Sequence, residues 1–207
     1  MNTVLNKQNL ISLSQPFNCS PWNYSGIEKV KEIPNERIVD WILVDVRDAA
    51  TAESAKPGSV VSRQAAFLLD DGSIVDLDGE SKIYFYNSIE EQLYVVISHR
   101  NHLAIMSSQP INEGEDSWIY DYTTNGNKVY GGELGYKKID ENTWAMVAGN
   151  GYRDSEISIS DKVYIWTPEV LETKVICQEI LVWMEKSTTL TKMKFFRITL
   201  GKRARYQ

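Results

Sequence analysis

Residues 150–161 carry oxygen-bearing side chains at a spacing that could hold a hard cation. The candidate ligands are Asn150, Asp154, Glu156, Ser158 and Asp161. Twelve-residue calcium loops use this spacing, with a backbone carbonyl at the position that Glu156 would fill. Tyr152 is a poor ligand for its position, and Ser155 stands where a glycine normally makes the sharp turn. The sequence therefore predicts a calcium site that is weak or lost.

The run His99-Arg100-Asn101-His102 is a second cluster with chemical potential, because imidazoles bind metals and transfer protons. Two histidines three residues apart could share a metal on a helix. Here they fall between two predicted strands, where residues three apart usually face opposite ways. The chain has no third histidine to complete a site. We therefore expect a turn whose imidazoles bond to the backbone.

Aromatic side chains recur at every second residue in Trp118, Tyr120 and Tyr122. This period of two places them on one face of a strand. A row of exposed rings could stack on sugars, whereas a buried row would belong to the core. The three residues are the candidate binding platform of a carbohydrate-binding module.

The motifs of several enzyme classes are missing. The chain contains no Gly-x-Ser-x-Gly elbow and no phosphate-binding glycine loop, and its 28 acidic residues single out no catalytic pair. We therefore expect no enzyme. A net charge of -6 argues against a nucleic-acid partner, and no apolar run of about 18 residues predicts a membrane span. The N-terminus Met1–Lys7 lacks the order of a signal peptide, so in an exported protein this chain would not be the native beginning.

The segments that would position these groups have β texture from 33 to about 125. Ile38–Arg47 is rich in β-branched and aromatic residues, and Asp70-Asp71-Gly72-Ser73 is a strong hairpin turn. Short strands without a long helical period predict a mainly β fold, an Ig-like or related β-sandwich at 33–125. We expect residues 1–32 to be irregular, and 126–169 to be a linker followed by the degenerate calcium loop.

Several stretches carry a resemblance to a known family: Leu13-Ser14-Gln15-Pro16-Phe17-Asn18, Val46-Arg47-Asp48-Ala49, 63–75 and 99–107. On these residues the chain resembles a β module near the C-terminus of large secreted bacterial surface proteins. The resemblance covers about residues 2–169. In that family a dockerin-like pair of calcium loops follows the module. The resemblance therefore implies a short α-helical dockerin-like appendage, a cohesin-like partner, and a parent protein that is secreted or at the cell surface.

The tail, 170–207, departs from this pattern, because a second calcium loop should follow Glu169. Back-translation with a shifted reading frame turns part of the tail into D-I-G-M-D-G-E-V-N-N-F-D, a well-formed calcium loop. Trp183-Met184-Glu185 forces the D-G of this loop, since the codons of tryptophan and methionine both end in G. Our hypothesis is that a frameshift near Glu169–Val170 made the tail an accidental peptide without selected structure.

The function expected from these features is that of a non-catalytic extracellular structural or binding module with a vestigial, cohesin-docking segment. The alternative is a carbohydrate-binding module that supports polysaccharide degradation. The two hypotheses differ in what they require of Trp118, Tyr120 and Tyr122, because only the second needs these rings exposed on the surface.

Overall fold

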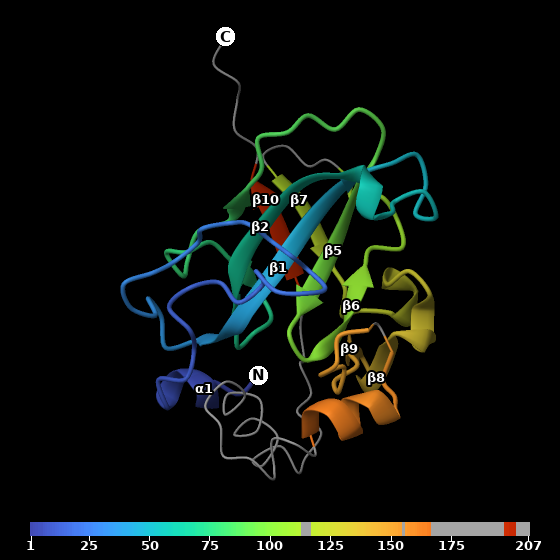
Figure 1. The fold of residues 1–207 in the computed structure, drawn as a ribbon. Helices are drawn as coiled ribbons and strands as arrows, with labels where there is room; N and C mark the ends of the chain where they lie inside the picture. The colour runs from blue at the N-terminus through green and yellow to red at the C-terminus, as the bar shows by residue number, and fades with distance from the viewer. Residues whose placement is uncertain (113–116, 155, 167–196, 202–207) are drawn as a thin grey trace.

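The computed structural model describes residues 1–112, 117–154, 156–166 and 197–201. It is mainly β, as the sequence predicts, with mostly antiparallel strand pairs and short helices (Figure 1). The strands are β1 (Ile38–Asp48), β2 (Val60–Leu69), β3 (Ile74–Val75), β4 (Ile83–Tyr84), β5 (Leu93–His99), β6 (His102–Met106), β7 (Ser117–Asp121), β8 (Tyr136–Asp140), β9 (Thr143–Met146) and β10 (Arg197–Gly201). The helical segments are α1 (Val4–Lys7), η1 (Pro57–Ser59), η2 (Gly126–Lys128), η3 (Gly132–Leu134) and η4 (Asp161–Trp166), the last with π-type hydrogen bonding.

Five strands in the order β3-β2-β1-β5-β6 form the main sheet, and each pairs antiparallel with its neighbours. β1 lies at the centre, with Trp41 opposite Phe67 of β2 and Val44 opposite Ile97 of β5. The turn between β2 and β3 holds Gly72 at a φ of 88°, which glycine adopts at little cost. The hairpin predicted there is confirmed.

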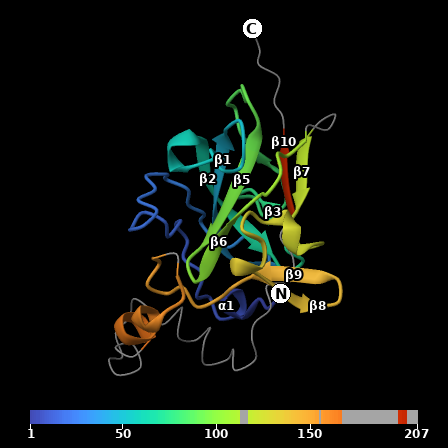
Figure 2. The same ribbon diagram turned by 90° about the vertical axis from the view of Figure 1, so that its right-hand side faces the viewer.

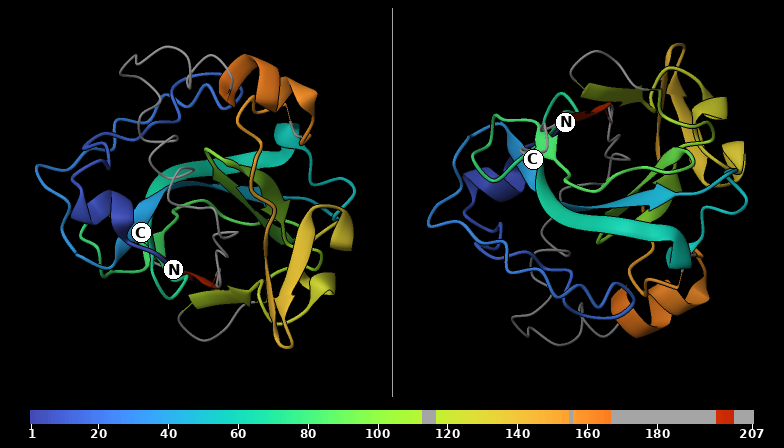
Figure 3. Two further views of the ribbon diagram at one scale, coloured as in Figure 1. Left: turned by 90° about the horizontal axis from the view of Figure 1, so that it is seen from below. Right: turned by 90° about the horizontal axis from the view of Figure 1, so that it is seen from above.

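The main sheet is buried on both faces. Alternate residues of β1 belong to two different cores: Ile42 and Val44 to one, Trp41 and Leu43 to the other. This explains why β1 is apolar almost without interruption, since a strand covered on both sides has no solvent-facing residues. The first core lies between the main sheet and the small sheet β4-β10-β7, and the second lies under the N-terminal segment (Figures 2 and 3).

The N-terminal segment, 1–32, has little regular structure but forms a layer of the molecule. Phe17 is fully buried against the main sheet, and Trp41 Nε1 donates a hydrogen bond to the carbonyl of Ser12 at 2.7 Å. Within the layer, the amide of Gln15 donates to the carbonyl of Glu28 at 3.0 Å. The segment is thus an integral cover of the second core.

The small sheet includes a strand from the predicted tail. β10 runs parallel to β4 and antiparallel to β7, and its Leu200 is buried in the first core. Residues 197–201 of the tail thus form a strand between β4 and β7, and the hypothesis of a frameshifted tail stays a prediction. Residues 170–196 and 202–207, and with them the shifted-frame calcium loop, lie outside the described residues.

The segment 126–169, predicted to be a linker followed by the calcium loop, includes a hairpin of β8 and β9. Its Tyr136 and Met146 belong to the first core, so this core extends beyond the boundary predicted at 125. The chain leaves β9 alongside β6, where the amide of Leu103 donates to the carbonyl of Val147 at 2.9 Å and His102 bridges Ala148. This short stretch leads directly into the segment that carries the predicted calcium loop.

Candidate functional site

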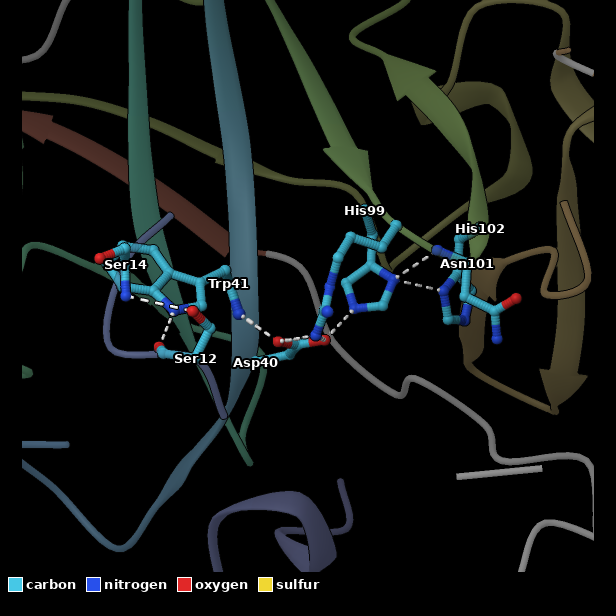
Figure 4. Close-up of polar contacts among 8 residues, drawn as sticks. Ser12, Ser14, Asp40, Trp41, His99, Asn101 and His102 are labelled. Carbon is cyan, nitrogen blue, oxygen red and sulfur yellow. Dashed lines mark hydrogen bonds and ion pairs between the residues drawn. The ribbon is translucent and has the colours of Figure 1, made fainter. Parts of the chain in front are cut away.

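A buried polar cluster lies at the turn between β5 and β6 (Figure 4). The turn consists of Arg100 and Asn101, and His99 and His102 flank it as a cross-strand pair. The fourth charged or titratable member, Asp40, comes from β1, 59 residues earlier than His99. The exposed fractions are 3% for Asp40, 5% for His99 and 2% for His102. Among the described residues, this cluster is where a histidine side chain contacts a carboxylate.

Both carboxylate oxygens of Asp40 accept hydrogen bonds. Oδ1 accepts from the amide of Trp41 and from Arg100 Nη2, each at 2.8 Å. Oδ2 lies 2.8 Å from Arg100 Nη2 and 3.1 Å from His99 Nε2. Beyond Leu43 and Ser98, β5 no longer pairs with β1, so the Asp40 side chain joins the strands where the backbone ladder ends. Asp40 therefore attaches the β5–β6 turn to the centre of the main sheet.

The imidazole rings of His99 and His102 approach each other through the same ring nitrogen, Nδ1. Nδ1 of His99 and Nδ1 of His102 are 2.9 Å apart, and the amide of Asn101 donates to Nδ1 of His99 at 3.2 Å. Because the Asp40 carboxylate only accepts, His99 must donate from Nε2, which leaves its Nδ1 as an acceptor. His102 must then donate from Nδ1. The contacts thus set both tautomers and form a chain from His102 through His99 to Asp40.

The electrostatics of the cluster favour a charged Asp40 and a neutral His102. Burial raises the pKa of Asp40, but the Arg100 guanidinium and His99 outweigh it and hold that pKa well below its usual range. Burial, together with the neighbouring His99, lowers the pKa of His102 well below 6.5, and the charge of Asp40 offsets only part of this effect.

The sequence identified the histidines of this cluster but not their partners. Residues three apart were expected to face opposite ways, but the two-residue turn makes His99 and His102 cross-strand partners on one face. Asp40 was missed, although an acid inside the apolar run of β1 signals a buried cation. An imidazole held by a carboxylate resembles a general base in chemistry, yet here each of the linked groups is buried.

The predicted calcium loop is organised around Asp161, which is 1% exposed. Its Oδ1 accepts from the amide of Tyr152 at 2.9 Å, and its Oδ2 accepts from the amide of Ser158 at 2.8 Å. In a calcium loop, carboxylates direct their oxygens at the ion. Here the carboxylate instead satisfies backbone donors, and so takes over the organising role that an ion would have.

The remaining candidate ligands differ from Asp161 in their surroundings. Asp154, Glu156 and Ser158 are exposed, and Asp154 Oδ1 accepts from the amide of Glu156. Asn150 is buried, and within the described part of the chain its Oδ1 accepts no hydrogen bond. Across the residues that the structure describes, no three His, Cys, Asp or Glu side chains gather as potential metal ligands.

Replacing Asp161 by alanine should loosen the loop, because it leaves two backbone donors without partners. We expect the unfolding free energy to fall by about 1–3 kcal/mol, and amide exchange to accelerate at Tyr152 and Ser158. The matched control is Asp154→Ala, which removes an exposed carboxylate of the same loop and should have little effect. Equal values for the two variants, measured by denaturant unfolding and hydrogen exchange, would contradict this role of Asp161.

The predicted glycan platform is part of the core. Tyr122 is fully buried, and its hydroxyl donates to the carbonyl of Val95 at 2.9 Å. Tyr120 is 6% exposed and packs edge-on against Tyr122, while Trp118 is partly buried against the same core. The alternation of period two was correct, but this face of β7 points inward, toward the main sheet. Tyr120 and Tyr122 are therefore not available to stack on sugars.

Five large apolar side chains are exposed on the segment that follows β9. We call this set of side chains the appendage surface; it consists of Tyr152, Ile157, Ile159, Val163 and Tyr164. The rings of Tyr152 and Tyr164 are in contact, with centroids 5.3 Å apart. Arg153 joins the segment to the N-terminal layer, where its guanidinium lies 5.1 Å from the Trp22 ring centroid and donates to Cys19 Sγ at 3.3 Å. The segment is thus held at its base and exposes apolar side chains.

Comparison of the chain with family models, curated proteins and solved structures finds no match. None of the helices in the described ranges is long and apolar enough to cross a membrane. The buried cluster and the appendage surface are therefore the features from which a function can be argued.

Proposed function

We propose that this chain is a non-catalytic structural and binding module of a secreted or cell-surface protein. In this proposal the two sheets form an Ig-like or related β-sandwich, and residues 150–166 are a vestigial dockerin-like appendage. The appendage offers its apolar surface to a protein partner of the cohesin type.

The observation that carries the proposal is the exposure of the appendage surface. Ile159 is 69% exposed and Tyr164 61%, and both belong to a short segment beside a well-buried core. Apolar side chains grouped on the surface of a soluble domain typically mark a protein interaction site. A helix that lays such residues into a partner's groove or onto its sheet is a common mode of recognition. The burial of Tyr120 and Tyr122 favours this protein partner over a glycan.

The buried cluster supports a non-catalytic role. His99 and His102 are the two histidines of the chain, and both bond within the cluster. A general base has to reach the proton that it abstracts, and groups exposed by 5% or less offer no surface for a substrate. Asp40 and the histidines are therefore assigned to attaching the turn.

The proposal is tested by titrating the full chain with isolated cohesin-type domains in a calorimeter, in calcium and in a chelator. We expect weak binding that calcium does not strengthen, because Asp161 already organises the loop. Ile159→Asp and Tyr164→Asp should each weaken binding at least tenfold, since a charge would be buried at the interface.

The matched control is Leu134→Asp, which changes a side chain that is 91% exposed in η3, outside the appendage surface. It should bind like the unmodified chain. Absence of binding to every cohesin-type domain tested, or equal loss with Leu134→Asp, would overturn the proposal. Binding that appears only with calcium would keep the partner but overturn the metal-independent loop.

A further inference from the structure

The β5–β6 turn is attached on two sides. On one side Asp40 bonds to Arg100 and His99. On the other side residues 147–149, which follow β9, bond to the turn and to the start of β6. The Gly149 amide donates to the carbonyl of Asn101 at 2.9 Å, and Ala148 bridges His102. Whatever displaces the turn therefore also displaces residues 147–149, and with them the beginning of the appendage.

A further proton on the histidine pair would create a buried charge. With Nδ1 facing Nδ1 at 2.9 Å, a single hydrogen satisfies both atoms, one as donor and the other as acceptor. His99 Nε2 already holds a hydrogen against Asp40, so the further proton enters at Nε2 of His102. His102 is 2% exposed, and its positive charge would lie in the same buried cluster as the Arg100 guanidinium.

We propose that the hydrogen-bonded chain Asp40–His99–His102 is an acid-sensitive latch, which holds residues 147–149 against the β5–β6 turn and the start of β6 near neutral pH and releases them on acidification. The latch concerns the segment that leads into the appendage and does not depend on what the appendage binds.

The charges around the latch give the direction of its response. Within the described part of the molecule, the charged and titratable groups that face it are Asp40 from β1, Arg100 from the turn and the two imidazoles themselves. The segment after β9 that packs against the latch, Val147–Gly149, contains no charged side chain. Since folding depresses the pKa of His102, its contribution to stability is complete above about 6.5 and is lost as the pH falls below that value. Opening therefore increases with acid, before carboxylates titrate near pH 4.

The latch is tested by hydrogen exchange of the full chain at pH 7.5 and pH 5.0, expressed as protection factors so that intrinsic rates cancel. The amides of Leu103 and Gly149 donate across the interface that should open. We expect their protection to fall at least tenfold at pH 5.0, while amides of β1 and β2 change less than twofold. Unchanged protection at Leu103 and Gly149 would overturn the latch, and so would an equal loss in β1, which indicates global unfolding.

Two variants separate the histidine pair from other titrating groups. His102→Gln removes the second titratable ring and should abolish the pH dependence at Gly149. Asp154→Asn removes an exposed carboxylate of the appendage and should leave that dependence intact. Retention of the dependence in His102→Gln would overturn the proposal. If that variant does not fold, the two imidazole signals of the unmodified chain decide by NMR. Protonation of the His102 ring while Gly149 stays protected would equally overturn it.

Discussion

Replacement of Asp40 by alanine is expected to destabilise the folded protein by about 3–5 kcal/mol, because it removes the buried carboxylate that pairs with the buried Arg100 guanidinium. The same change removes the acceptor of His99 Nε2 and the bond to the amide of Trp41. Equilibrium unfolding in urea, followed by tryptophan fluorescence and circular dichroism, measures the loss. The loss would be a large fraction of the net stability of a domain, which is about 5–15 kcal/mol, so the unfolding midpoint should fall markedly.

Two further variants show whether charge burial is the cause. Asp71→Ala removes an ion pair with Arg37 in which both side chains are about half exposed. The loss of unfolding free energy should therefore be under about 1 kcal/mol. The double variant Asp40→Leu, Arg100→Met removes both buried charges and should recover most of the stability lost in Asp40→Ala. A cost of less than about 1 kcal/mol for Asp40→Ala would show that the cluster does not hold the fold together in this way.

Deletion of residues 1–32 is the second change with a large expected effect, and it should abolish cooperative folding. The N-terminal layer buries Leu5, Ile11 and Phe17 against the main sheet, and each of these contributes about 1.5–3 kcal/mol. The net stability of a domain is about 5–15 kcal/mol, so the loss is comparable to the whole. The uncovered face would also expose Trp41 and Phe67, which are fully buried beneath the layer. We expect aggregation and a broad thermal transition by circular dichroism.

Point variants inside the layer show how much of the lost unfolding free energy comes from individual side chains. Phe17→Ala should cost about 3–5 kcal/mol, because the ring is fully buried. Ile27→Ser should change the stability little, since Ile27 is 90% exposed on the outer side of the same layer. A chain of residues 33–207 that unfolds with an unchanged midpoint would show instead that the layer is a dispensable appendage.

Several features of the fold follow from local sequence alone. The continuous apolar run of β1 indicates a strand, and Asp71-Gly72 indicates the turn into β3, because period and turn chemistry depend on near neighbours. The alternation of Trp118, Tyr120 and Tyr122 likewise placed them on one face. Whether that face points inward or outward depends on which sheet it packs against, and this the local pattern does not contain.

The candidate calcium loop illustrates the same limit. Its oxygen spacing is a property of the sequence, but the direction of Asp161 is a property of the folded segment. In the folded segment, two backbone donors of the loop bond to this carboxylate. The sequence could therefore indicate a loop with candidate ligands, whereas only the structure assigned the central carboxylate to the backbone.

What the sequence determined by itself is a mainly β chain with its principal turn and with a histidine cluster between two strands. The tertiary structure alone decided that β1 is covered on both faces, that β10 closes the small sheet, and that Asp40 meets His99 across 59 residues. The physical reason is one of range. Turn conformation and strand period arise from steric and hydrophobic preferences of adjacent residues, whereas the pairing of Asp40 with Arg100 and His99 requires the register of β1 against β5 to be set first.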